Sequence, residues 1–243
     1  MAGVTATAGP YASTMGYVGM TGSRPGRRVE IGLTSYDSRL KRLSHDPRFI
    51  FINNYKCGYS SSNKLPHRPV HAIADSDEIV FFYRSIYLRT ISVFVNWCIT
   101  DARYETEDGW LFTNLRRAMT DAAYRDFLGA LRGGQHPDAF VMFLENLETI
   151  AAWNDHTRPQ AAVLDRYRID RIDHFIELEN NRPFRELTGV DFPYDIANRS
   201  ATPLKLSLID VLLTEDRLRG ALQEIYRKDL DFLQRHNLEC LPC

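Results

Sequence analysis

The chain has 243 residues, of which 44% are hydrophobic and 25% charged, the ordinary balance of a globular protein. This length suits one large domain or two small ones, and it allows a sizeable core without disulfide staples. Lys and Arg number 30 and Asp and Glu 31, so the net charge is -1, which argues against a dedicated nucleic-acid binder. A local basic pocket for a small polyanion is compatible with that balance.

Neither a membrane span nor a disulfide framework is predicted. No apolar run approaches the ~18 residues that a bilayer-spanning helix needs, and four cysteines are too few for a disulfide-dense scaffold. Cys240 and Cys243 form a single C-x-x-C pair, without the second pair that would complete a zinc site. We expect free thiols in a reducing compartment, while a redox or metal-binding role of the terminal pair stays open.

Residues 1–23 carry no charge and are rich in Gly, Ala, Thr and Ser. A secretory signal would need a basic start and a compact apolar stretch, and this segment has neither. Because such a composition cannot bury enough surface to offset its ordering entropy, we expect a flexible tail over 1–28. The remainder, 29–243, is expected to be one α/β domain, and a cytoplasmic location is the default expectation.

The first predicted strand, 48–55 (RFIFINNY), is short and rich in aromatic and β-branched residues. It runs into Lys56-Cys57-Gly58-Tyr59-Ser60-Ser61-Ser62. A strand, a turn of small residues and a helix start form the arrangement that cradles phosphate on backbone N–H groups. The order is not that of a Walker loop, because the lysine stands first and the hydroxyls follow the glycine. A plain strand-to-helix turn with a solvated lysine explains the same residues.

A second strand is predicted at 78–83 (EIVFFY), followed by a helix that Ser85 caps and that ends near Thr100. This helix is apolar nearly all round and is expected to be central and buried. Strands alternating with helices favour a central parallel sheet flanked by helices, a three-layer, P-loop-like fold with a helical C-terminal half. The further helices are predicted at about 111–132, 138–151, 204–213 and 215–236, the last with Thr214 as its N-cap, and His136-Pro137 and Arg182-Pro183 mark breaks.

Arg84, Arg89 and Ser92 form a second group of interest. Arg84 follows the predicted strand at its carboxyl end, where open α/β sheets place their ligands. Ser92 lies two turns along the following helix, so an arginine fork and a hydroxyl could clamp one phosphate. A surface arginine and a small helix-packing serine are the alternative.

Together, the loop at Lys56 and the segment at Arg84 resemble the sulfotransferases that use 3′-phosphoadenosine 5′-phosphosulfate (PAPS). In that family the loop after strand one holds the 5′-phosphosulfate, and a later R-D-P-x-x-R-x-x-S segment holds the 3′-phosphate. This chain reads Arg84-Ser85-Ile86-Tyr87-Leu88-Arg89-Thr90-Ile91-Ser92, so both arginines and the serine match, while Ser85-Ile86 replaces the D-P pair. Losing that proline reduces pre-organisation but removes no ligand.

Later segments extend the resemblance to the Golgi-type carbohydrate sulfotransferases, the family 2-like group, from about residue 48 to 233. Each is short, and their order and spacing carry the similarity. Without a membrane anchor, the chain resembles a soluble, bacterial-style member. The segments are 155–160 with an H-x-x-P-Q element, 169–173 through Leu178-Glu179-Asn180, Asn198-Arg199-Ser200, and 224–232, which resembles the family's closing Y-x-x-D-x-x-x-F helix but has one residue fewer between Asp229 and Phe232.

The resemblance implies in-line transfer of a sulfuryl group from PAPS to a hydroxyl of a carbohydrate, a glycosylated molecule or another small acceptor. The desulfated nucleotide PAP is the product, and no metal, nucleic acid or membrane is required. Lys56 would neutralise charge on the departing 5′-phosphate, assisted by loop N–H groups. The implied cofactor-binding residues are Lys56, Cys57, Gly58, Tyr59, Ser60, Ser61, Arg84 and Ser92.

An alcohol acceptor also needs a base, and histidine is the usual choice. His71 lies in the interval where uronyl 2-O-type members carry a catalytic histidine, and we favour it over the nearby His67. His156, in the H-x-x-P-Q element, is a third candidate, with loop structuring as its alternative. Asp170 and Asp173, which have three arginines nearby, are interpreted as surface charges rather than as a glycosidase pair.

Two other functions fit parts of the pattern. A nucleotide-dependent phosphotransferase with a divergent loop would want Mg²⁺ ligands and the G-K-[ST] order, and the sequence offers neither. A non-catalytic relative that binds the nucleotide or a protein partner would not need Lys56. Metal dependence separates the first of these from a sulfotransferase, and turnover of a Lys56→Ala variant separates the second.

Overall fold

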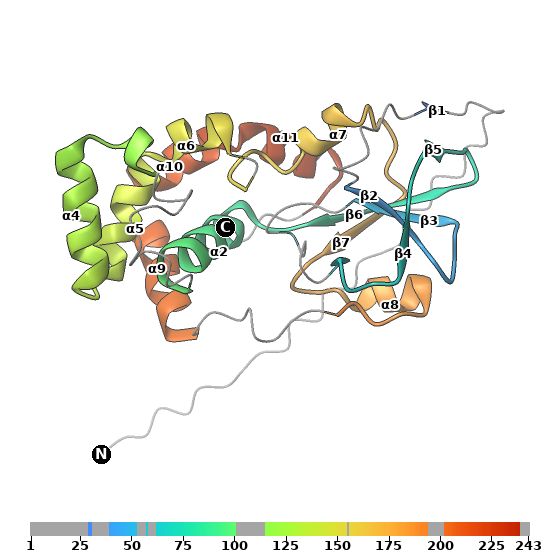
Figure 1. The fold of residues 1–243 in the computed structure, drawn as a ribbon, viewed down its shortest axis with the longest axis horizontal. Coiled ribbons are helices and arrows are strands. Elements are labelled where there is room, and N and C mark those ends of the chain that lie inside the picture. Colours follow the sequence, from blue (N-terminus) through green and yellow to red (C-terminus); the bar gives the residue numbers. More distant parts are fainter. Residues whose placement is uncertain are drawn as a thin grey trace, which may run out of the picture.

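The computed structural model describes residues 29–30, 39–52, 57, 62–100, 115–154, 156–193 and 202–238. The predicted tail 1–28 and the Cys240–Cys243 pair lie outside these residues, as do Lys56 and 58–61 of the predicted serine loop. In the described part, a five-stranded sheet occupies one end of the molecule and a group of helices the other (Figure 1).

The sheet has the strand order β4-β2-β3-β6-β7. Strands β3, β6 and β7 run parallel to one another, whereas β2 is antiparallel to both β3 and β4. The strands are β2 (Leu40–Leu43), β3 (Phe49–Ile52), β4 (His67–Pro69), β6 (Glu78–Tyr83) and β7 (His174–Glu177), and β1 (Val29–Glu30) pairs with β5 (Ala72–Ile73) as a separate antiparallel ribbon.

The prediction of a parallel sheet is wrong for β2 and β4, and the sheet is mixed. The turn 44–48 between β2 and β3 is too short for the crossover that a parallel pair requires. Neither missed strand shows a strand-like sequence: β2 reads LKRL, and β4 contains Pro69, which suits an edge strand. The two predicted strands are confirmed as β3 and β6, with the described part of the first ending at Ile52.

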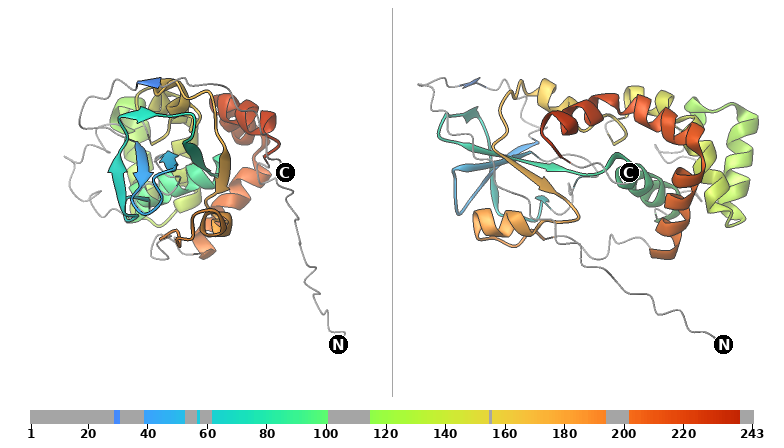
Figure 2. Two further views of the ribbon diagram at one scale, coloured as in Figure 1. Left: turned by 90° about the vertical axis from the view of Figure 1, so that its right-hand side faces the viewer. Right: turned by 180° about the vertical axis from the view of Figure 1, so that it is seen from behind.

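Helices cover both faces of the sheet, because alternate residues of its apolar strands point to opposite sides. Ile79 and Phe81 of β6 pack with residues from α7 (Ala162–Arg166) and α11 (Arg227–Arg235). Val80 and Phe82 pack instead with α8 (Arg182–Thr188). Figures 1 and 2 show α8 on one side of the sheet and α7 and α11 on the other.

The helical end of the molecule surrounds α2 (Ile86–Phe94), which leaves β6 directly and continues as the π-helical turn η1 (Val95–Thr100). Most of α2 is buried, as predicted from its apolar sequence. Phe94 lies against Phe140 and Phe143, at ring-centroid distances of 5.0 and 5.6 Å. The other helices of this cluster are α4 (Asp121–Arg132), α5 (His136–Glu145), α6 (Leu147–Trp153), α9 (Thr202–Thr214) and α10 (Asp216–Ile225).

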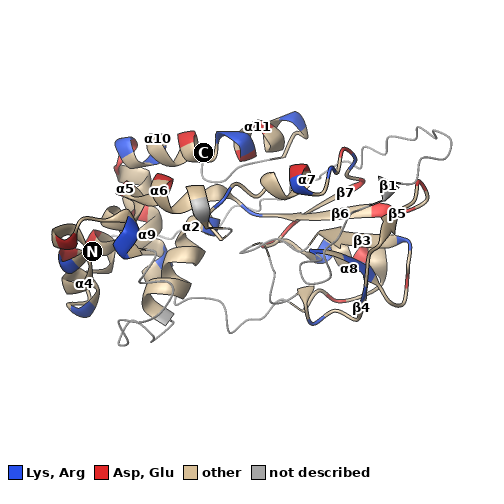
Figure 3. Cartoon of the chain, turned by 45° about the horizontal axis from the view of Figure 1, so that its top comes forward, with Lys and Arg blue, Asp and Glu red and all other residues tan. Residues whose placement is uncertain are grey.

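The long helices predicted after residue 110 are subdivided. Thr120 interrupts the first and caps α4 by accepting a hydrogen bond from the Ala123 N–H. Asn146 separates α5 from α6, and Tyr226 separates α10 from α11. Thr214 is not an N-cap, because it ends α9 and donates its hydroxyl to the Asp210 carbonyl. The C-terminal half is mostly helical, and both positively and negatively charged residues lie along its helices (Figure 3).

Candidate functional site

Three polar residues gather where the parallel strands end. Cys57 follows β3, Arg84 follows β6 and Glu179 follows β7. All three strands run in one direction, so their carboxyl ends form one edge of the sheet, the edge at which open α/β sheets bind ligands. Together with Gln160 and Asp229, these residues form what we call the carboxyl-end network.

Gln160 is the centre of this network and is fully buried. Its side-chain Oε1 accepts the backbone N–H of Arg84 and the thiol of Cys57, each at 3.1 Å. Its Nε2 donates to the Arg84 carbonyl at 2.7 Å. The glutamine amide therefore satisfies both backbone groups of the residue that follows β6, and it ties that residue to the loop that follows β3.

Arg84 is almost completely buried, and its guanidinium pairs with Glu179. The Nε–Oε1 distance is 2.5 Å, and the Glu179 side chain is 30% exposed. This contact engages Nε, and the planar guanidinium also carries N–H donors of the kind that bind the oxygens of a phosphate.

Asp229 supports the network from α11. Its two carboxylate oxygens accept the backbone N–H groups of Gln160 and Ala161, at 2.8 and 2.7 Å. Burial raises the pKa of Asp229 to about 6, and the charge of Arg89 and the two N–H donors oppose that rise. The carboxylate thus holds the backbone from which the Gln160 side chain reaches Arg84.

Arg89 and Tyr226 fill the space beside Asp229. The Arg89 guanidinium carbon lies 5.6 Å from the centre of the Tyr226 ring, in cation–π range. The Tyr226 hydroxyl donates to the Thr157 carbonyl at 2.6 Å, and burial raises the pKa of Tyr226 to about 12. Arg89 is therefore part of the interior, whereas Ser92, one turn further along α2, is only half-buried.

The structure brings together two of the predicted cofactor-binding residues, Cys57 and Arg84, through their shared partner Gln160. Burial raises the pKa of the Cys57 thiol to about 12, so this group acts as a hydrogen-bond donor and not as a thiolate. The predicted site residues Lys56, Gly58, Tyr59, Ser60 and Ser61 lie outside the described residues.

The two favoured histidines lie elsewhere on the sheet. His67 is in β4 and His71 is in the turn before β5, and strands β2 and β3 separate β4 from β6. His67 Nδ1 lies 2.7 Å from the Leu65 carbonyl and Nε2 lies 3.0 Å from Lys41 Nζ. Because the carbonyl requires the proton on Nδ1, the Nε2 lone pair of His67 is engaged by the ammonium. His71 is exposed.

His156 is held inside the loop between α6 and α7. Its backbone N–H donates to the Asn154 side chain at 2.8 Å, and its ring centre lies 5.4 Å from that of Trp97. These contacts favour the loop-structuring interpretation of this histidine.

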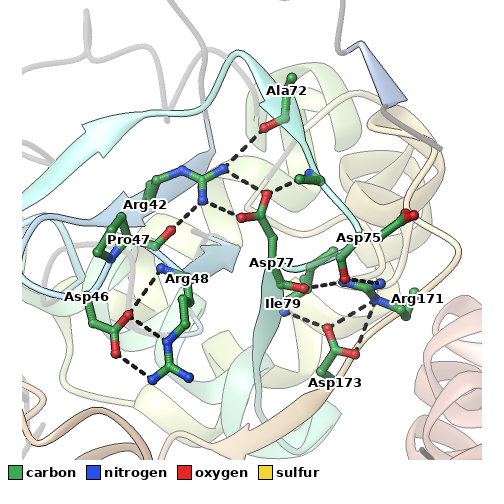
Figure 4. Close-up of polar contacts among 11 residues, drawn as sticks. Arg42, Asp46, Pro47, Arg48, Ala72, Asp75, Asp77, Ile79, Arg171 and Asp173 are labelled. Carbon is green, nitrogen blue, oxygen red and sulfur yellow. Dashed lines mark hydrogen bonds and ion pairs between the residues drawn. The ribbon is translucent and has the colours of Figure 1, made fainter. Parts of the chain in front are cut away.

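A second polar cluster, the amino-end network, lies where β6 and β7 begin (Figure 4). Arg42 makes a two-pronged bond to Asp77, at 2.5 and 2.9 Å. Asp173 accepts the Ile79 N–H at 2.7 Å and pairs with Arg171, which donates to the Asp77 carbonyl. Asp173 is therefore not a simple surface charge, because it fastens the chain entering β7 to β6.

Sequence reasoning noted Gln160, Glu179 and Asp229 only as parts of resembling segments and assigned them no role. Asp229 bonds to a backbone 69 residues away, a contact that no local pattern encodes. The sequence held no clear signal for Asp229, because it stands in the charged stretch RKDLDFLQR and resembles a solvent-exposed residue.

The described residues form neither a candidate metal site nor a candidate membrane-spanning helix. They contain no group of three or more His, Cys, Asp or Glu side chains that could hold a metal ion. None of their helices is both long and apolar enough to cross a bilayer. Comparison of the chain with protein-family models, with curated proteins and with solved structures found no significant match.

Proposed function

We propose that the protein is a PAPS-dependent sulfotransferase that acts on a hydroxyl of a carbohydrate, a glycosylated molecule or another small acceptor. One observation carries the proposal: Cys57 and Arg84, from the two segments predicted to bind phosphate, share Gln160 as a hydrogen-bond partner. They meet at the carboxyl ends of adjacent parallel strands. Two segments that were paired by sequence resemblance alone are thus neighbours in space.

In this proposal the fold is a three-layer, P-loop-like one. The parallel strands β3, β6 and β7 with helices on both faces support that assignment. The loop after β3 holds the 5′-phosphosulfate, with Lys56 and the serine hydroxyls as donors. Arg84 and Ser92 hold the 3′-phosphate and so orient the nucleotide.

The proposed step is an in-line displacement at sulfur. The acceptor oxygen forms a new S–O bond while the bond from sulfur to the 5′-phosphate oxygen breaks, and PAP leaves with the electron pair. Lys56 neutralises the charge that develops on the departing oxygen. The acceptor proton passes to a base at the carboxyl ends of the parallel strands. Neither His67, in β4, nor His71, which precedes Ala72 of the amino-end network, lies there, so we propose neither of them as that base.

Calorimetric titration of the purified protein with PAP, with and without Mg²⁺, tests this proposal without knowledge of the acceptor. We expect binding in the micromolar range that does not depend on Mg²⁺ and weakens strongly with 5′-AMP, which lacks the 3′-phosphate. Absence of binding at millimolar PAP by folded protein would refute the proposal. Binding that requires Mg²⁺ and prefers a nucleoside triphosphate would instead indicate a phosphotransferase.

A further inference from the structure

The amide of Gln160 joins two segments that are separate in sequence. It pairs with both backbone groups of Arg84 and accepts the Cys57 thiol, so one planar group sets the spacing between the end of β6 and the loop after β3. Full burial and the bonds from Gln160 N–H and Ala161 N–H to Asp229 keep this group in place. Rotation of the amide by half a turn would break three hydrogen bonds of a fully buried group.

We propose that Gln160 is a positioning residue that holds the two anion-binding segments at the separation required by a ligand carrying two phosphate groups. This inference rests on the proposed function, in which each segment binds one phosphate of the nucleotide. Gln160 does not contact the ligand in this account. It raises affinity because the second phosphate finds its partner already at the correct distance once the first is bound.

The ratio of PAP affinity to 5′-AMP affinity tests this role directly. 5′-AMP engages only the loop after β3, whereas PAP engages both segments. In Gln160→Met, which keeps the side-chain length and loses the amide, we expect this ratio to fall by about tenfold or more. The affinity for 5′-AMP should change much less. Gln234→Met, at an exposed position of α11, is the matched control and should keep the wild-type ratio.

A second pair of variants covers the case in which Gln160→Met does not fold. Cys57→Ser keeps a donor for Gln160 Oε1, whereas Cys57→Val removes it at similar volume. The serine variant should retain more of the PAP-to-AMP ratio than the valine variant.

The outcomes separate this inference from the proposed function. Wild-type protein that binds PAP, together with folded Gln160→Met that keeps the full ratio, would overturn the positioning role alone. Equal losses for PAP and 5′-AMP would also overturn it, because a general structural defect weakens both ligands alike. Wild-type protein that binds neither ligand would overturn the proposed function and this inference together.

Discussion

The two ends of the sheet carry polar networks of opposite character. The carboxyl-end network is enclosed: Gln160 and Asp229 are both 0% exposed. The amino-end network is open to water, with the side chains of Arg42 and Arg171 at 21% and 41% exposure. Both networks bind strand-end backbone, but only the enclosed one collects buried arginines where parallel strands end. Burying polar groups costs free energy, and proteins often accept such a cost at functional sites. We therefore place the candidate site at the enclosed network.

Removing Asp229 should have the largest effect on stability. Asp229→Ala leaves two buried N–H groups without their acceptor and removes the negative charge that interacts with the buried Arg89, and we expect a loss of about 3–5 kcal/mol in the free energy of unfolding. Asp231→Ala, at an exposed position of the same helix, should stay within about 0.5 kcal/mol of wild type. Urea titration measures both, and similar losses in the two variants would contradict the importance of the enclosed network.

Removing Arg84 should affect ligand binding most. If its guanidinium meets the 3′-phosphate in a buried site, Arg84→Ala should weaken PAP binding by about 2–5 kcal/mol in calorimetry. Arg182→Ala, which removes an exposed arginine from α8, should leave PAP affinity unchanged. If the PAP affinities of Arg84→Ala and wild type are indistinguishable, Arg84 serves only its ion pair with Glu179.

At the amino end, Asp77→Ala should cost less than Asp229→Ala. It removes the two-pronged bond to Arg42 and the acceptor of the Ala74 N–H, hydrogen bonds to a charged group that are worth about 1.5–3 kcal/mol. PAP affinity should not change, because the network lies at the opposite edge of the sheet. A parallel loss of PAP binding in the folded variant would show that the two networks are not independent.

The two carboxylates should also give opposite pH dependence. Burial raises the pKa of Asp229 to about 6, above the ordinary 3.8, so its contribution to stability is complete below the ordinary pKa and is lost as the pH rises through about 6. Burial would also raise the pKa of Asp77, but the hydrogen bonds from Arg42 and Ala74 and the nearby arginine charges lower it overall. Its contribution is therefore present above the ordinary pKa and is lost as the pH falls through the folded value.

Urea titrations of wild type, Asp229→Asn and Asp77→Asn at several pH values from about 2 to 7 measure these slopes. The stability deficit of Asp229→Asn should shrink as the pH rises, and that of Asp77→Asn should shrink as the pH falls. If both stability deficits change with pH in the same direction, the pKa values of Asp229 and Asp77 are not shifted in opposite directions.

Some elements and site residues could be predicted from the sequence, and others could not. The apolar runs at β3 and β6 and the buried helix α2 were predictable, because burial on all sides leaves a continuous hydrophobic pattern. Strands β2 and β4 were not, since β2 contains two charged residues in four and β4 contains a proline, so neither shows such a pattern. Arg84 was found from its position after a strand, whereas the role of Gln160 required the fold, because its partners lie far away in the chain.

The smallest expected effect comes from Glu179, and it tests whether Arg84 serves the ion pair or a ligand. Glu179→Gln keeps a carbonyl acceptor for Arg84 Nε and removes one negative charge from the site. The loss of stability should be about 1 kcal/mol or less, since the Glu179 side chain is 30% exposed. PAP should bind slightly more tightly, because the guanidinium charge is no longer shared with a carboxylate. Glu179→Ala, which loses the acceptor as well, is the comparison in calorimetry. If Glu179→Gln weakens PAP binding, the carboxylate is needed to hold Arg84, and the 3′-phosphate does not compete with it for the same charge.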